Sequence, residues 1–246
     1  MNHISKNERY CHWPEEDSGA YALRVCQDLL RHLLSGWPRR SRSVLTLGAG
    51  SCALVETLWD AGFDVTAQDD NRECLDRARA LLGSRADFVL SAPDHLPYDD
   101  DAFDYAVATL ALEFWEDPEA VLTEMNRLAT RGVVLLFPNA WSLFGLECHI
   151  RRGNRLCRSA RPLLHSPRQL YYMANRVFDG KRRAWASVLP LPSGFWRQGF
   201  FFRRINTLYM PFPLGAFAGL RIDFGPTFSG TPLLVKHSQP VADIKP

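Results

Sequence analysis

The sequence lacks a long hydrophobic run, which argues against a membrane-spanning protein. No stretch reaches the roughly 18 consecutive apolar residues that a span needs, and the longest apolar stretch, residues 209–220, contains two prolines. The amino-terminal residues MNHISKNERY are polar and lack the apolar core of a signal peptide. We therefore expect a cytoplasmic protein.

Closely spaced cysteines are also lacking. The six cysteines lie at positions 11, 26, 52, 74, 148 and 157, and no two of them form a C-x-x-C pair. A disulfide framework or a zinc knuckle would place cysteines at short, regular spacings. We therefore expect reduced thiols and no metal site.

Acidic residues are scarce in the second part of the chain. Residues 1–150 contain 13 Lys and Arg against 24 Asp and Glu, whereas residues 151–246 contain 16 against 3. The formal net charge of +2 conceals this asymmetry. A basic segment can attract an anionic substrate, a membrane face or a nucleic acid, or it can be a solvated face that complements the acidic half.

What is present is the composition of a folded protein. Of the 246 residues, 46% are apolar and 23% are charged, a balance that is typical of a globular domain. The sequence contains no internal repeat and no low-complexity linker. We therefore expect a single domain over residues 1–246.

Segments with helical and strand-like periodicity alternate along the chain. Strands are predicted over residues 44–47, 63–67, 87–90, 105–109, 133–137, 185–189 and 217–224. Helices are predicted over residues 20–34, 53–61, 72–82, 118–129 and 141–152, and from Ser166 and Pro167 onward. Strands that alternate with helices predict a mostly parallel sheet with helices on both faces.

A glycine turn follows the first predicted strand. Gly48, Ala49 and Gly50 lie between that strand and the next helix, and Asp69 follows the second strand. Glycines at such a turn let backbone N–H groups approach a ligand, and the acid can accept both hydroxyls of a ribose. The pattern indicates a nucleoside-containing cofactor. It also fits the dinucleotide fingerprint G-x-G-x-x-A, so an NAD(P)-dependent oxidoreductase stays an alternative.

Four motifs between residues 96 and 127 separate these alternatives. They are Leu96-Pro97-Tyr98, the acidic segment Asp101 to Asp104 before an apolar strand, Leu112-Glu113-Phe114 with Asp117-Pro118, and Glu124-Met125-Asn126-Arg127. In this order they resemble the class I S-adenosylmethionine-dependent methyltransferases. The chain also resembles the stand-alone bacterial members of this family, of the methyltransferase type 11 kind, outside these motifs. The residues that carry this further resemblance are Tyr10 with Trp13 and Gly19-Ala20-Tyr21, Asn139-Ala140-Trp141-Ser142 and Gly215-Ala216-Phe217.

This resemblance implies a Rossmann-like α/β fold. The sheet would have seven mostly parallel strands with helices on both faces, and a basic, aromatic-rich cover segment would follow strand 5. Within the single domain, residues 1–40 would form an N-terminal cap region, 41–139 the cofactor-binding core, and 140–246 the substrate cover and final strands. The implied activity is methyl transfer from S-adenosylmethionine to a small or lipid-like, anionic acceptor.

The resemblance also assigns the cofactor residues. The glycine turn would pass under the methionine part, Asp69 would hold the ribose and Asp70 would flank the adenosine. Leu110 would lie near the sulfonium, and Tyr10 would close over the cofactor. The resulting set is Tyr10, Gly48, Ala49, Gly50, Asp69, Asp70, Asp94, His95 and Leu110.

Three cofactor positions depart from the family pattern. Thr46 stands where an acid normally orients the methionine amino group, and Cys52 replaces the third glycine. Ala92 replaces the acid that accepts the adenine amino group, and Asp94 and His95 lie close enough to substitute for it. Two lost charged hydrogen bonds, at about 1.5–3 kcal/mol each, would weaken binding tens- to thousands-fold. A degenerate, non-catalytic binding or regulatory protein is therefore the alternative function.

The acceptor site is predicted after strand 5. Methyl transfer relies on positioning and desolvation, so no fixed catalytic residue is required and none is assigned. Trp141, His149 and Arg152 are the substrate candidates, because aromatic and basic side chains are interleaved there. Such a segment suits an anionic amphiphile or a peripheral membrane contact. No nucleic-acid partner is expected, since no RNA-binding module accompanies the basic residues, and the oligomeric state stays unknown.

Overall fold

The computed structural model describes residues 17–50, 52–112, 115–150, 166–196 and 200–225. Seven strands form one sheet in the order β3-β2-β1-β4-β5-β7-β6. The strands are β1 (Ser43–Leu47), β2 (Asp64–Asp69), β3 (Ala86–Leu90), β4 (Phe103–Thr109), β5 (Ala129–Pro138), β6 (Arg182–Val188) and β7 (Phe217–Asp223). The first five strands pair in parallel, and β7 is antiparallel to both β5 and β6.

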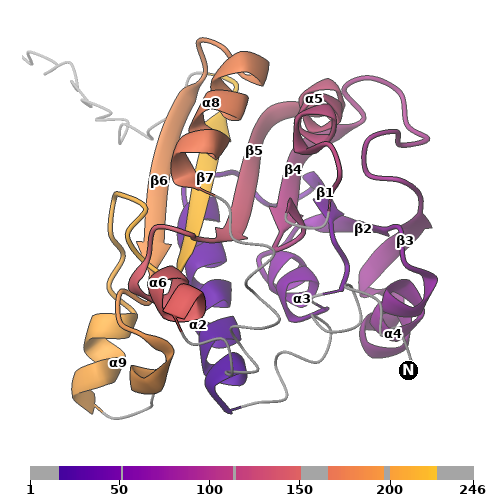
Figure 1. Cartoon of the computed structure of the whole chain (residues 1–246). Coiled ribbons are helices and arrows are strands. Elements are labelled where there is room, and N and C mark those ends of the chain that lie inside the picture. Colours follow the sequence, from indigo (N-terminus) through magenta and orange to yellow (C-terminus); the bar gives the residue numbers. More distant parts are fainter. Residues whose placement is uncertain (1–16, 51, 113–114, 151–165, 197–199, 226–246) are drawn as a thin grey trace, which may run out of the picture.

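Helices cover both faces of this sheet (Figure 1). The described helices are α2 (Asp17–Leu34), α3 (Cys52–Asp60), α4 (Arg72–Leu82), α5 (Pro118–Leu128), α6 (Leu143–Ile150), α8 (Pro167–Val177) and α9 (Phe200–Asn206). One hydrophobic core lies between the sheet and α2, α3, α4 and α6. The other lies between the sheet and α5 with α8. The central strands β1, β4 and β5 are buried on both faces, which is why their sequences read as short apolar runs.

Local sequence sets the ends of the helices. Asp117 accepts hydrogen bonds from the N–H groups of Glu119 and Ala120 and thereby caps α5. Asn71 caps α4 in the same way through the N–H of Glu73, and α4 ends at Gly83, whose φ is 57°. Helix α4 begins three residues after β2 and α5 begins after an eight-residue connection from β4, so both amino termini follow the carboxyl end of a strand.

The seven-stranded, mostly parallel fold predicted from the sequence is confirmed. Most element bounds shift by only a few residues; the strand predicted over 133–137 extends over Ala129–Pro138. Helix α9 was not predicted, because its aromatic run masks the helical period. Ser166 precedes α8 as expected, but its side chain makes no capping hydrogen bond.

Candidate active site

The glycine turn lies at the carboxyl end of β1, between β2 and β4. The N–H groups of Gly48 and Ala49 both donate to the carbonyl of Gln68, at 3.0 and 3.1 Å. Gly48 has a φ of 93°, and a Cβ at this residue would come 2.4 Å from the Cβ of Ala111. Only glycine meets both conditions, so the turn keeps its backbone close to the end of β4.

Asp69, the last residue of β2, links the glycine turn to the loop between β2 and α4. Its two carboxylate oxygens accept from the N–H of Gly50 (3.1 Å) and from the N–H of Asn71 (2.9 Å). The residue is 8% exposed. Burial is the main cause that raises its pKa to about 6, and the negative charge of Asp70 adds to the rise. A carboxylate offers about four acceptor sites, so the two backbone hydrogen bonds do not use its full capacity.

Two threonines occupy the space where the family pattern has a carboxylate. Thr46 is fully buried on β1, and its hydroxyl lies 3.4 Å from the hydroxyl of Thr109 on β4. Thr109 in turn donates to the carbonyl of Gly48 at 2.9 Å. The hydroxyl pair is neutral, so it is buried without the cost of a charge. It fixes the glycine turn but offers a ligand amino group no negative charge.

The residue after β4 is held in an unusual conformation. Leu110 has a φ of 54°, is 3% exposed and donates its N–H to the carbonyl of Leu136 at 3.0 Å. A left-handed, branched residue is uncommon, and such conformations gather at functional sites. Ala111, the next residue, is the one that leaves no room for a Cβ at Gly48. Strand β4 therefore ends against the glycine turn.

Two side chains of helix α5 hold the loop after β3 in place through hydrogen bonds. Glu124 is 7% exposed and accepts from the N–H of Leu96 at 2.8 Å. Arg127 bonds both oxygens of Glu124 and donates to the carbonyl of Tyr98 and to Asp100. The Arg127 hydrogen bond is the main cause that holds the pKa of Glu124 below its usual range. This clamp (Glu124 and Arg127) fixes the loop that contains Ala92, Asp94 and His95, all exposed.

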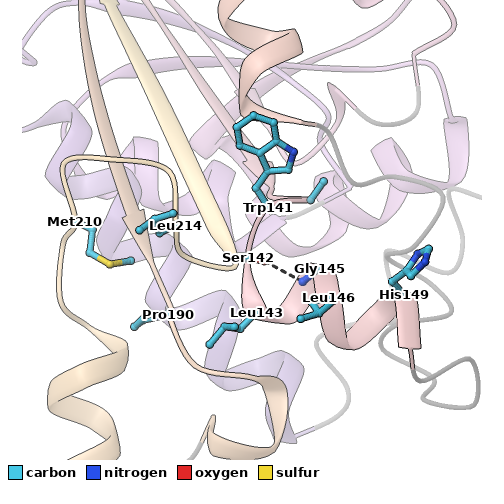
Figure 2. A pocket seen from close by; sticks show the side chains of 10 residues that line it. Trp141, Ser142, Leu143, Gly145, Leu146, His149, Pro190, Met210 and Leu214 are labelled. Carbon is cyan, nitrogen blue, oxygen red and sulfur yellow. Dashed lines mark hydrogen bonds between the residues drawn. The ribbon is translucent and has the colours of Figure 1, made fainter.

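A pocket of about 770 Å³ lies further along the same edge, beyond the end of β5. Its lining residues are Ala140, Trp141, Ser142, Leu143, Gly145, Leu146, His149, Pro190, Met210 and Leu214. Figure 2 shows that they come from the turn after β5 together with α6, from the connection after β6 and from the loop before β7. Ligand sites of small molecules have this size and are mostly apolar with a few polar groups. The pocket suits an acceptor with an apolar body.

Asn139 holds together two of the segments next to this pocket. Its side-chain amide donates to the carbonyls of Pro213 (2.8 Å) and Gly215 (2.9 Å), and its oxygen accepts from the N–H of Trp141 (2.8 Å). The residue is fully buried. One side chain therefore fixes the turn after β5 against the loop before β7, which follows more than seventy residues later in the chain.

The structure brings many of the sequence-predicted residues to one edge of the sheet. The glycine turn, Asp69 and Leu110 lie at the ends of adjacent strands, and Trp141 and His149 line the neighbouring pocket. Asp70 is exposed beside Asp69. Tyr10 and Arg152 lie outside the described residues. The described residues contain no group of three or more His, Cys, Asp and Glu that could hold a metal.

Sequence reasoning missed three contributors to the site. The left-handed conformation of Leu110 has no signal in a single sequence. The clamp residues were seen as a motif, but their contact with residues 96–100 depends on the fold. Asn139 was likewise part of a motif whose partners, Pro213 and Gly215, are far away in the chain.

Comparison with known proteins fits this geometry. Residues 45–137, from β1 to β5, match the family model of the methyltransferase domain. This part of the chain is a class I methyltransferase domain. The match covers the glycine turn, Asp69, Leu110 and the clamp of this chain. It ends before the pocket beyond β5.

Three curated relatives align with the methyltransferase domain over part of their length. An uncharacterised methyltransferase of Mycobacterium tuberculosis is 36% identical over 39% of this chain and 38% of its own length. The malonyl-[acyl-carrier protein] O-methyltransferase of Salmonella typhimurium is 31% identical over 45% and 43%. The ubiquinone biosynthesis O-methyltransferase of Vibrio atlanticus is 32% identical over 39% and 42%. The chain thus spans less than half the length of these relatives.

Solved structures share the fold over most of the chain. A methyltransferase of Thermotoga maritima, described as a possible histamine N-methyltransferase, covers 89% of this chain and 99% of its own, with a TM-score of 0.65 and 16% identity. The magnesium protoporphyrin IX methyltransferase of Synechocystis, solved with bound S-adenosylhomocysteine, covers 91% and 88%, with a TM-score of 0.57 and 15% identity. At such identities the likeness concerns the fold alone.

Proposed function

We propose that the chain transfers a methyl group from S-adenosylmethionine to an oxygen atom of a small, apolar-bodied and anionic acceptor. The observation that carries this proposal is the adjacency of the two sites. The glycine turn with Asp69 lies at the ends of β1 and β2, and the apolar pocket lies beyond β5 at the same edge. Ligands of open α/β sheets bind at this edge.

The described residues fit the cofactor at its ribose and its methionine part. Asp69 lies at the end of β2 as a potential acceptor for the ribose hydroxyls, and the absence of a side chain at Gly48 lets the turn pass close to the end of β4. When bound, S-adenosylmethionine supplies a methyl group on a sulfonium. Leu110 and Ala111 cover the turn from β4 and exclude water there, which favours transfer to an oriented acceptor.

The acceptor class is supported by the pocket and by the relatives. The pocket walls are mostly apolar, with His149 at one side. The Salmonella and Vibrio relatives are both named for O-methyl transfer. The basic composition after residue 150 favours an acidic acceptor. A carboxylate or phenolate oxygen is itself a nucleophile, so this chemistry needs no protein base.

A second candidate is a binding protein of the same fold without turnover. It is favoured by Thr46, which stands where the family pattern has a carboxylate and instead contacts Thr109 in the interior. In that case the protein would bind S-adenosylhomocysteine as well as S-adenosylmethionine and would modify no acceptor.

Titration calorimetry with S-adenosylmethionine, S-adenosylhomocysteine and NAD tests the proposal. We expect the first two to bind and NAD not to bind. Asp69→Ala removes charged hydrogen bonds of about 1.5–3 kcal/mol and should weaken binding by roughly 10- to 150-fold. Asp64→Ala, an exposed position at the opposite end of β2, is the matched control and should leave binding unchanged. Binding of NAD instead would overturn the cofactor assignment.

Turnover then separates the two candidates. Carboxylic acids of increasing chain length, with the matching alcohols, would be offered with labelled cofactor. We expect methylated acids and a KM that falls as the apolar chain grows. Trp141→Ala should raise this KM and leave cofactor affinity unchanged, because Trp141 lines only the pocket. Cofactor binding with no methylated product from any acid would support the binding protein.

A further inference from the structure

A hollow of about 270 Å³ lies between helix α2 and the end of helix α9. Figure 1 shows α9 next to α2. None of the residues that line this hollow lines the pocket beyond β5. The lining residues are Tyr21, Arg24, Val25 and Asp28 of α2, with Arg203 and Thr207 from the opposite wall. The proposed function leaves this hollow without a role.

Both walls of the hollow are held by contacts with the rest of the fold. Asn206, on α9, is fully buried, and its side-chain amide donates to the carbonyl of Phe195 at 3.0 Å. Its own carbonyl accepts from the N–H of Leu189 at 3.0 Å. Just beyond α9, the ring of Tyr209 stacks on the ring of His32 of α2, with centroids 4.2 Å apart. The fold therefore fixes α9 and the segment that follows it against α2.

The lining includes a buried hydroxyl that has no hydrogen-bond partner. Tyr21 is 6% exposed, and its hydroxyl oxygen bonds none of the described residues. A buried polar group without a partner costs free energy, and native proteins pair nearly all such groups with protein, water or a ligand. A phenolic hydroxyl can donate one hydrogen bond. A hydrogen-bond acceptor bound in the hollow would supply the missing partner.

Two arginines line the hollow, one on each wall. Arg24 and Arg203 are exposed, and neither side chain forms an ion pair with a described residue. Asp28, the acidic residue of the lining, forms an ion pair at 2.9 Å with Arg31, which lies outside the lining. The hydroxyl of Thr207 donates to the carbonyl of Arg203 at 2.9 Å. The donors that remain for a ligand are therefore two guanidinium groups and the phenolic hydroxyl.

We propose that this hollow binds a small oxyanion, a phosphate or a carboxylate group. Guanidinium groups bind both through charge-assisted hydrogen bonds, and the hydroxyl of Tyr21 donates a further one. An apolar ligand would leave that hydroxyl without a partner, and the two arginine charges would repel a cation.

The oxyanion would also act on the acceptor pocket. Arg203 and Thr207 line the hollow, and Met210 and Leu214 of the same chain segment line the pocket beyond β5. An oxyanion held between α2 and α9 would anchor this segment at one end. That consequence alone rests on the proposed function.

Thermal unfolding of the full chain with inorganic phosphate tests the site. Neither cofactor nor acceptor is added, and sodium chloride at the same ionic strength is the reference. Phosphate should raise the melting temperature in a saturable way, because a ligand that binds only the native state stabilises it by mass action. Acetate in a parallel titration shows whether the site prefers the carboxylate group. No stabilisation by either anion beyond that of chloride would overturn the proposal.

Three kinds of substitution locate the binding in the hollow. Arg24→Gln and Arg203→Gln should each weaken phosphate affinity by about tenfold, through the loss of a charge-assisted hydrogen bond. Tyr21→Phe should also weaken it, yet leave the protein without phosphate at least as stable as the parent, because the lost hydroxyl has no partner. Asp28→Asn should strengthen binding, since it removes a negative charge from the lining.

The matched control is Arg77→Gln on α4. Like Arg24, Arg77 is exposed and forms no ion pair with a described residue, but it lies outside the hollow, so its variant should bind phosphate as the parent does. Equal loss of affinity in these two variants would overturn the proposal, because it would show unspecific attraction of charge. So would weaker binding by Asp28→Asn, or unchanged phosphate affinity in Tyr21→Phe. Titration of the cofactor is a separate measurement, so failure at this hollow leaves the proposed function standing.

Discussion

The two ends of the carboxyl edge are built in opposite ways. Around β1, β2 and β4, buried polar groups hold the backbone: Asp69 bonds the glycine turn, and Thr109 bonds the carbonyl of Gly48. Beyond β5, Asn139 fixes the backbone next to the pocket, but the walls of the pocket are apolar side chains, several of them about half exposed. The first region is complete without a ligand, whereas the second still exposes apolar surface that a ligand would cover. Under the proposed function, the fold fixes the geometry of the cofactor region, and the choice of acceptor depends on side chains that contribute little to the stability of the fold.

Among the substitutions that test this comparison, we expect one in the glycine turn to have the largest effect on stability. Gly48→Ala combines an unfavourable φ with a clash against Ala111, and we expect it to lower the free energy of unfolding by about 2–6 kcal/mol. Gly62 has the same φ of 93° but nothing within 4 Å of a Cβ. Gly62→Ala should therefore cost only the backbone strain, about 1–3 kcal/mol. Urea denaturation measures both, and equal losses would show that Ala111 moves aside.

The clamp should have the next largest effect. Arg127→Gln leaves the buried carboxylate of Glu124 without its cation, at a cost of about 1–3 kcal/mol near neutral pH. Arg127 lowers the pKa of Glu124, so this stability is present above the ordinary carboxyl pKa and is lost as the pH falls through the lowered value. Denaturation of parent and variant should thus converge in acid. Arg79→Gln, which removes an exposed ion pair with Asp76, should cost at most about 1 kcal/mol.

Asp69 should give a smaller, pH-dependent effect of the opposite sign. Its pKa is about 6 in the folded protein against an ordinary value of 3.8, so the native state binds the proton more tightly than the unfolded chain. Stability should therefore fall as the pH rises through this interval, by about 1 kcal/mol per unit at most. Asp69→Asn should abolish the decline in thermal unfolding scans. Cofactor affinity should show the reverse trend and weaken below a pH of about 6, because the ionised carboxylate is the better acceptor.

The acceptor pocket should give the smallest effect on stability. Leu143 is 50% exposed, and Leu143→Ala should change the free energy of unfolding by less than about 0.5 kcal/mol. The same variant should raise the KM of an apolar acceptor, measured with labelled cofactor. A large loss of stability would mean that the pocket walls are structural and would remove the contrast between the two regions.

Sequence alone predicted the sheet and the position of the glycine turn well, for physical reasons. Strands β1, β4 and β5 are buried on both faces, so their apolar runs are unmistakable, and the glycine turn follows directly from the φ that Gly48 requires. The pocket was harder to predict because its lining comes from three separate segments. Trp141 and His149 were identified, but Pro190, Met210 and Leu214 have no local signal and join the pocket only through the fold.

Strand β7 is the last strand in the part of the chain that the structure describes, yet it lies between β5 and β6. Until residue 223 leaves the ribosome, the edge of β5 has no neighbour, and the partners of Asn139 do not yet exist. We therefore expect this edge of β5 to stay unpaired in the nascent chain until β7 inserts. A product truncated before β7 would expose a bare strand edge, which is a template for pairing with another chain.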